Sequence, residues 1–120
     1  MQFAVLAYEK PGTYEALSAA ELEQMTAEYF AIAELPGYIG GAQLQPIETA
    51  SAVRVEGGET LITDGPFANT KEVFGGFDLF EAESLDSAVL EIAARCPAAR
   101  LGGVVEVRPL VHVHGLEGTV

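Results

Sequence analysis

Apolar residues recur along this 120-residue chain with two kinds of spacing, one typical of strands and the other typical of helices. The opening run at residues 3–8 is short, apolar on both sides and followed by Pro11-Gly12, so it predicts a strand. Two longer segments carry apolar residues every three or four positions, which predicts one helix after Ser18 and another at about 84–96. Ser18 and Glu21 have the spacing of a capping box at the start of the first helix.

Shorter alternating runs occupy much of the remaining chain and predict strands at residues 39–44, 52–56, 59–63, 73–82 and 104–109. Gly57-Gly58 separates two of these runs and predicts a two-residue hairpin, with Glu56 opposite Glu59 and Arg54 opposite Leu61. The order β, α, several β, α, β predicts one α+β domain, a sandwich of an antiparallel sheet with both helices on one face. We expect its core to span about 1–110, followed by a C-terminal tail.

The face of this sheet opposite the helices is also predicted to be apolar. Alternation places the following residues there: Ala4, with Leu6 or Tyr8, then Leu61, and either Phe77 and Leu79 or Phe80 and Ala82. An uncovered apolar face is unfavourable in water. We therefore predict a homodimer that packs sheet against sheet and encloses a cavity lined by a few polar residues.

The excess of acidic residues argues against two classes of partner. Eighteen acidic residues against six basic ones give a formal net charge of −12, which repels phosphate backbones and anionic lipids, so we expect no nucleic acid and no membrane as partner. The first residues lack the basic start of a secretory signal, which predicts a cytoplasmic protein. Cys96, the only cysteine, ends an apolar helical stripe, which favours a buried hydrophobe over a nucleophilic thiol.

One stretch, TDGPFANTKEVFGGF at residues 63–77, is the most unusual in the chain because Gly-Pro forces a turn between charged residues. With this stretch, the chain closely resembles the YCII-related family, and within it the DGPF subgroup. The other matching segments are MQFAVLAY at 1–8, GGAQLQP at 40–46, AARCPAA at 93–99 and VEVRPL at 105–110. The resemblance covers nearly the whole chain in order.

This resemblance implies a ferredoxin-like α+β fold that dimerises into an α+β barrel. It implies no assigned reaction, since the family is known chiefly as domains of unknown function, some encoded beside or fused to extracytoplasmic-function sigma factors. Similar dimeric α+β barrels include cofactor-independent monooxygenases and muconolactone isomerases, a likeness of fold alone. The family usually has Glu where this chain has Asn69, so no acid–base role is carried over to that position.

Charged residues in and beside the Gly-Pro turn are the first candidates for chemistry. Asp64 precedes the turn and acts either as a general base at a pocket mouth or as the acceptor that shapes the turn. Lys71 and Glu72 either contact an anionic substrate or form a solvated pair. Adjacent strand residues face opposite ways, so only one of the two can line a pocket, and we choose Lys71.

The second group of candidates lies on the predicted strands. Arg54 shares a hairpin face with Leu61, and Arg108 follows Glu106 on the last strand, so we expect both arginines to project into the cavity between protomers. A guanidinium there favours a planar carboxylate or enolate, and an ion pair with a nearby carboxylate is the alternative. Asp78 is placed in mid-strand, as a partner for one of these arginines.

Together these residues predict a homodimer that binds a small anionic or enolisable molecule, with cofactor-independent catalysis as an open possibility. The predicted binding residues are Arg54, Lys71 and Arg108, and the predicted catalytic carboxylates are Asp64, Asp78 and Glu106, their pKa raised by partial burial. The alternative is a non-catalytic sensor or interaction module, such as a partner of an extracytoplasmic-function sigma factor.

We expect neither a cofactor nor a metal. The Gly-Gly pairs at 40–41, 57–58, 75–76 and 102–103 fit no nucleotide-binding motif and are interpreted as turns, bulges and element boundaries. His112 and His114 have the spacing of two neighbouring ligands on one strand face, but no third ligand stands at a recognisable spacing. We therefore interpret them as part of an exposed tail.

Overall fold

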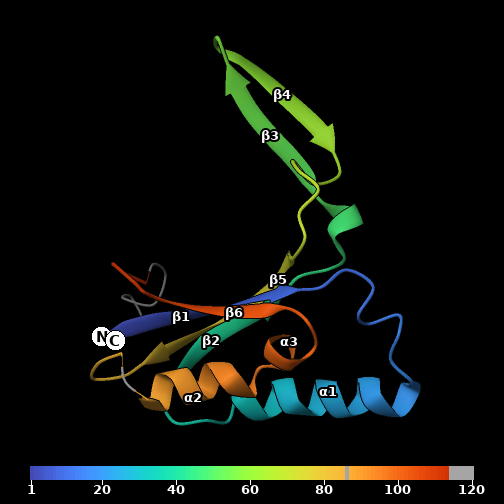
Figure 1. Ribbon diagram of the computed structural model, residues 1–120. Coiled ribbons are helices and arrows are strands. Elements are labelled where there is room, and N and C mark those ends of the chain that lie inside the picture. Colours follow the sequence, from blue (N-terminus) through green and yellow to red (C-terminus); the bar gives the residue numbers. More distant parts are fainter. Residues whose placement is uncertain (86, 114–120) are drawn as a thin grey trace.

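A four-stranded antiparallel sheet with strand order β2-β5-β1-β6 forms the centre of the chain (Figure 1). The structure is a computed structural model and describes residues 1–85 and 87–113. The four strands are β1 (Gln2–Glu9), β2 (Tyr38–Gln43), β5 (Val73–Glu81) and β6 (Val104–Pro109). With one helical connection between β1 and β2 and another between β5 and β6, this is the predicted ferredoxin-like α+β arrangement.

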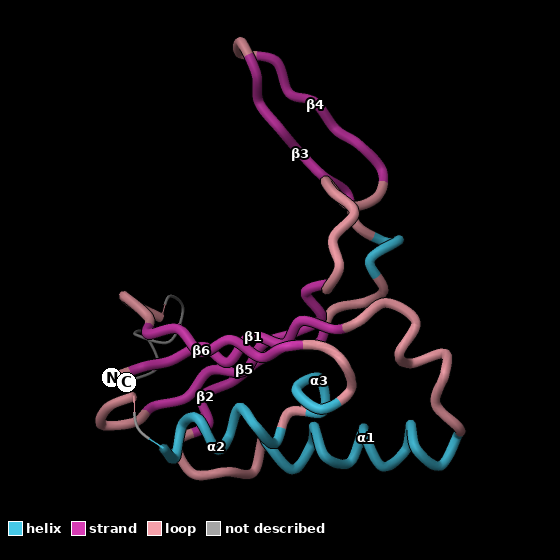
Figure 2. Tube along the Cα trace, viewed as in Figure 1, coloured by secondary structure: helices cyan, strands magenta, loops and turns pink. Residues whose placement is uncertain are grey.

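Helices cover one face of this sheet (Figures 1 and 2). They are α1 (Ala19–Ile32), α2 (Ser87–Arg95) and the short α3 (Pro97–Arg100). The predicted capping box is confirmed: the Ser18 hydroxyl accepts from the Glu21 amide at 3.1 Å, and the Ser18 amide donates to the Glu21 carboxylate at 2.9 Å. Pro97 ends α2 and begins α3, because its fixed φ suits a first helical position.

The core lies between the sheet and the helices and is built from Val5, Ile32, Phe80, Ala93 and Cys96. The Phe80 ring packs edge-on against Tyr38, with the ring centres 5.4 Å apart. Cys96 is buried, and this burial raises the pKa of its thiol to about 12. The interpretation of Cys96 as a buried hydrophobe is therefore confirmed.

The opposite side of the sheet, which we call the outer face, is largely apolar. Its side chains come from Ala4, Leu6, Tyr8, Phe74, Phe77, Leu79, Glu106 and Arg108. Of the two alternatives left open by alternation, Phe77 and Leu79 are therefore on this face, and Phe80 points into the core. The Phe74 ring stacks on Phe77 at 6.5 Å and contacts Tyr8 at 5.4 Å.

Strands β3 (Ser51–Glu56) and β4 (Glu59–Asp64) form a separate two-stranded hairpin. Its predicted register is confirmed, with Arg54 opposite Leu61 and Glu56 opposite Glu59. The prediction that Leu61 belongs to the outer face of the main sheet is wrong, because the hairpin pairs with no other strand of the described chain and projects away from the sandwich (Figures 1 and 2). The Gly57-Gly58 turn specifies pairing within the hairpin only, since it constrains no residue outside it. A single-turn 3₁₀ helix, η1 (Ile47–Thr49), precedes the hairpin.

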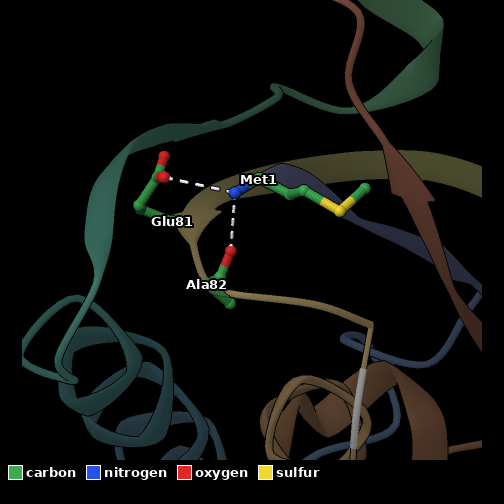
Figure 3. A network of polar contacts seen from close by, with 3 residues as sticks. All are labelled: Met1, Glu81 and Ala82. Atoms are coloured by element: carbon green, nitrogen blue, oxygen red, sulfur yellow. Dashed lines mark hydrogen bonds and ion pairs between the residues drawn. The ribbon is translucent and has the colours of Figure 1, made fainter.

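The start of the chain is tied to the end of β5. The amino group of Met1 donates to the carbonyl of Ala82 at 2.7 Å and lies 3.3 Å from a Glu81 carboxylate oxygen (Figure 3). These contacts continue the β1–β5 ladder, in which Gln2 lies opposite Glu81. They help to hold the register that decides which side chains of β1 and β5 face the helices.

Candidate functional site

A cavity of about 240 Å³ lies between α1 and the edge of the sheet formed by β2, β5 and β1. We call it the helix-side cavity. Its chemically informative lining residues are Glu9, Met25, Tyr29, Phe30, Tyr38 and Asp78. Among the described residues of the lining there is no lysine or arginine. The cavity therefore combines aromatic surface with two carboxylates.

Asp78 reaches this cavity because of its register in β5. It lies opposite Val5 of β1 and Gly41 of β2, and Val5 belongs to the core under the helices. Partial burial raises the pKa of the Asp78 carboxyl, and the hydrogen bond from the Tyr38 hydroxyl partly opposes that rise. Gly41 makes room for the carboxylate, since a β-carbon there would lie 2.6 Å from Asp78 Oδ1.

Glu9 supplies the second carboxylate from the end of β1. Partial burial raises the pKa of its carboxyl, against a smaller lowering by the hydrogen bond that the Tyr14 hydroxyl donates to Oε1. Burial also raises the pKa of Tyr29 to about 12 and that of Tyr14 further. Both phenols therefore stay protonated near neutral pH and remain hydrogen-bond donors.

Glu9 also borders a second cavity, of about 380 Å³, beside the loop at residues 10–15 and the segment 43–48. The two cavities share Glu9, Met25, Thr26, Gln43 and Gly75 in their linings. The two cavities therefore adjoin at Glu9. The two spaces together approach the volume of ordinary small-molecule sites.

The other predicted site residues lie elsewhere in the chain. Arg54 and Asp64 are exposed on the hairpin, and Lys71 is exposed on the loop that leads to β5. Glu106 and Arg108 are exposed on the outer face. Within one chain the structure therefore brings only Asp78 to the helix-side cavity.

The expected pairing of Asp78 with Arg54 or Arg108 does not form within the protomer. Asp78 faces the helices, whereas Arg108 lies opposite Ala4 on the outer face and Arg54 is carried on the projecting hairpin. The partner of Asp78 is instead Tyr38, a neutral hydrogen-bond donor. This difference leaves the carboxyl with a raised pKa, where an adjacent guanidinium would have lowered it.

The sequence alone did not indicate Glu9, Tyr14 or Tyr38 as site residues. A signal for them exists in the glycines of β2 and β5, since a glycine inside a strand often marks the close approach of another group. A β-carbon at Gly75 would overlap the Glu9 carboxylate, as one at Gly41 would crowd Asp78. Of the turns, bulges and boundaries expected at Gly-Gly pairs, a bulge occurs at Gly75-Gly76, and another register shift lies just before Gly40. The second role of these glycines, as space for carboxylates, could be seen only in the fold.

Comparison with known proteins places the chain in a family. The YCII-related domain matches residues 1–114. The chain belongs to the YCII-related domain family. The resemblance to this family seen in the sequence is thereby confirmed. This YCII-related chain is also similar to "Uncharacterized protein R00369" of Rhizobium meliloti (strain 1021), with 37% identity over 114 residues and 92% of each chain covered.

Two further findings describe this YCII-related chain. Within residues 1–85 and 87–113, no group of three or more His, Cys, Asp or Glu side chains is arranged to hold a metal ion. His112 is exposed, and His114 lies outside the described residues. In the same part of the chain, no helix is both long enough and apolar enough to cross a bilayer.

Proposed function

We propose that this YCII-related protein binds a small, uncharged, enolisable molecule in the helix-side cavity and that Asp78 moves its proton. The observation that carries this proposal is a half-buried carboxyl with a raised pKa at the wall of an aromatic cavity. Such groups are the usual general bases of small-molecule sites. The raised pKa makes the Asp78 carboxylate a stronger base than a carboxylate in water.

The chemistry needs only residues of this chain. Asp78 takes the proton from the carbon next to a carbonyl, and the C–H electron pair moves into the enolate, with the negative charge on oxygen. Tyr38, whose pKa is raised by burial and by Asp78, remains protonated. Once Asp78 has taken the proton, the single O–H of Tyr38 can leave Asp78 and donate a hydrogen bond to the enolate oxygen. Return of the proton to the same or another carbon gives exchange or isomerisation.

The lining argues against the anionic ligand that the sequence also allowed. Glu9 and Asp78 give the helix-side cavity a negative field, and its described lining offers no cation to balance a carboxylate ligand. An uncharged carbonyl compound avoids this repulsion. Met25, Phe30 and the tyrosines supply apolar contact for its carbon skeleton.

Deuterium exchange tests the proposal directly. A panel of neutral ketones, 1,3-dicarbonyl compounds and lactones is incubated with the protein in deuterated buffer, and loss of the α-proton signal is followed by NMR. We expect at least one compound to exchange, and the rate enhancement over buffer to fall at least 100-fold in Asp78→Asn. The matched control Asp64→Asn should exchange like the wild type. Equal rates in wild type and Asp78→Asn would remove Asp78 from the chemistry.

We further propose that the protein is a homodimer through its outer faces. The support is the concentration of Leu6, Tyr8, Phe74, Phe77 and Leu79 on a sheet face that none of the described helices covers. In such a dimer Glu106 and Arg108 would lie at the interface between the two sheets. The predicted roles of Arg108, Arg54 and Lys71 then concern the space between protomers and not the helix-side cavity.

The second candidate function is a non-catalytic sensor or interaction module, for example one that acts with an extracytoplasmic-function sigma factor. The exposed apolar side chains of the β3–β4 hairpin favour an interaction role. A ligand that raises the melting temperature without any proton exchange would support this candidate over catalysis.

A further inference from the structure

We propose that the hairpin arm, defined as β3 and β4 with their turn, packs its apolar face against a second copy of this chain. That face carries Val53, Val55 and Ile62, which are 60%, 68% and 70% exposed. A two-stranded hairpin without a third strand or a covering layer is marginally stable in water. The arm has neither within residues 1–85 and 87–113, so an intermolecular cover explains its extended form.

The size of the exposed surface fits a second copy. The radius of gyration is 16.3 Å, against about 14 Å for a compact chain of this length. The chain exposes 8268 Å², roughly 2,000 Å² more than the about 6,200 Å² typical of a compact protein of this mass. An obligate dimer buries roughly 1,000–2,500 Å² of each protomer, which covers this excess.

The direction of the arm also fits a second copy of this chain as its partner. The arm leaves the sandwich on the side of the sheet opposite the helices, the side of the outer face (Figure 1). If two outer faces meet, each arm extends alongside the other protomer, and this inference therefore rests on the proposed homodimer. In a two-fold dimer both arms make the same contact, so each side-chain contact occurs twice.

The charges of the hairpin arm and of the outer face are compatible with this contact between protomers. The arm carries Arg54 together with Glu56 and Glu59, and the outer face carries Glu106 and Arg108. These charged residues of the arm lie on the face of Leu61, opposite the apolar face, so the apolar face buries no charge against the second copy.

Sedimentation equilibrium of the wild type and single variants tests the arm. We expect a wild-type dimer and, for Ile62→Glu, a dimer dissociation constant at least 100-fold larger, because two buried sites receive an unpaired charge. Two controls carry the same change: Leu61→Glu on the other face of the arm and Leu90→Glu on α2, which is 54% exposed. Both should leave the dissociation constant within about threefold of the wild-type value, a shift of less than 1 kcal/mol.

Hydrogen exchange gives an independent readout. The amides of the arm should exchange at least tenfold more slowly above the dissociation constant than below it, with no such change on the exposed side of α1. A wild-type monomer would overturn both the dimer and the arm contact. A wild-type dimer that Ile62→Glu leaves unchanged would overturn the arm contact alone. Arm protection that appears only when an unrelated protein is added would also overturn it.

Discussion

The carboxylate of Glu9 occupies the space that a side chain at Gly75 would need. The two residues come from neighbouring strands, and the β1–β5 ladder shifts register beside them, so that Ala7 lies opposite Gly76 and Tyr8 opposite Phe74. This bulge turns the glycine toward the end of β1. The absence of a β-carbon is therefore what lets a charged side chain lie between the two cavities.

Replacing Gly75 by alanine should displace the Glu9 side chain, because the three atoms nearest to the new β-carbon all belong to the Glu9 carboxylate. We expect a loss of about 1–3 kcal/mol in unfolding free energy. The pKa of Glu9, followed by NMR, should fall toward its ordinary value as the carboxylate moves into water.

Gly40→Ala is the matched control for Gly75→Ala. A β-carbon at Gly40 has open space around it, so the substitution should be neutral or stabilise by up to about 1 kcal/mol. Equal destabilisation by both variants would show that the strands simply reject alanine. It would contradict a specific fit between Gly75 and Glu9.

The stability that Glu9 and Asp78 contribute should fall as the pH rises above about 4. The folded-state pKa values of Glu9 and Asp78 are raised by burial, so the folded state binds protons more tightly than the unfolded chain. Their contribution is complete below the unfolded pKa values, near 4, and is lost as the pH rises through the raised values. Urea unfolding at fixed protein concentration from pH 4 to 8 measures this loss.

Neutral variants should remove that pH dependence. The Glu9→Gln/Asp78→Asn double variant should lose less unfolding free energy than the wild type over the same interval, since neither amide titrates. Each single variant should fall between the two. A double variant with the same slope as the wild type would assign the pH dependence to other groups.

The capping box should contribute measurably to α1. Ser18→Ala removes the acceptor for the Glu21 amide, and we expect it to cost about 1 kcal/mol of unfolding free energy. Thermal unfolding should register this as a lower midpoint. Thr26→Ala is a suitable control in the same helix. The Thr26 hydroxyl donates to the carbonyl of Leu22, and the backbone hydrogen bonds of the helix do not depend on this side-chain contact. If Thr26→Ala lost as much unfolding free energy as Ser18→Ala, the result would argue against a special role for the cap.

Leu6→Glu should dissociate the proposed dimer. Leu6 lies between Phe77 and Glu106 on the outer face, so the new carboxylate would enter an apolar interface beside a like charge. We expect light scattering at micromolar concentration to change from dimer to monomer mass. Leu22→Glu, an equivalent change at an exposed position on α1, should leave the mass unchanged. A wild-type protein of monomer mass would contradict the dimer itself.

Local pattern was sufficient for the elements of the fold. The apolar period of α1, its Ser18–Glu21 cap and the Gly57-Gly58 hairpin all depend on residues within a few positions of one another. The α+β class followed from their order along the chain. The separation of the hairpin from the main sheet did not follow, because a turn that aligns β3 with β4 carries no information about a third strand.

The site depended on contacts between distant segments. Asp78 could be chosen from its mid-strand position, but its face was set by pairing with Val5 and Gly41, and its partner proved to be Tyr38. The sequence by itself determined the periodicities, caps and turns and the excess of negative charge. Only the tertiary structure decided which carboxylates are half buried. That outcome depends on strand register and bulges, through which residues far apart in the chain come to share one cavity.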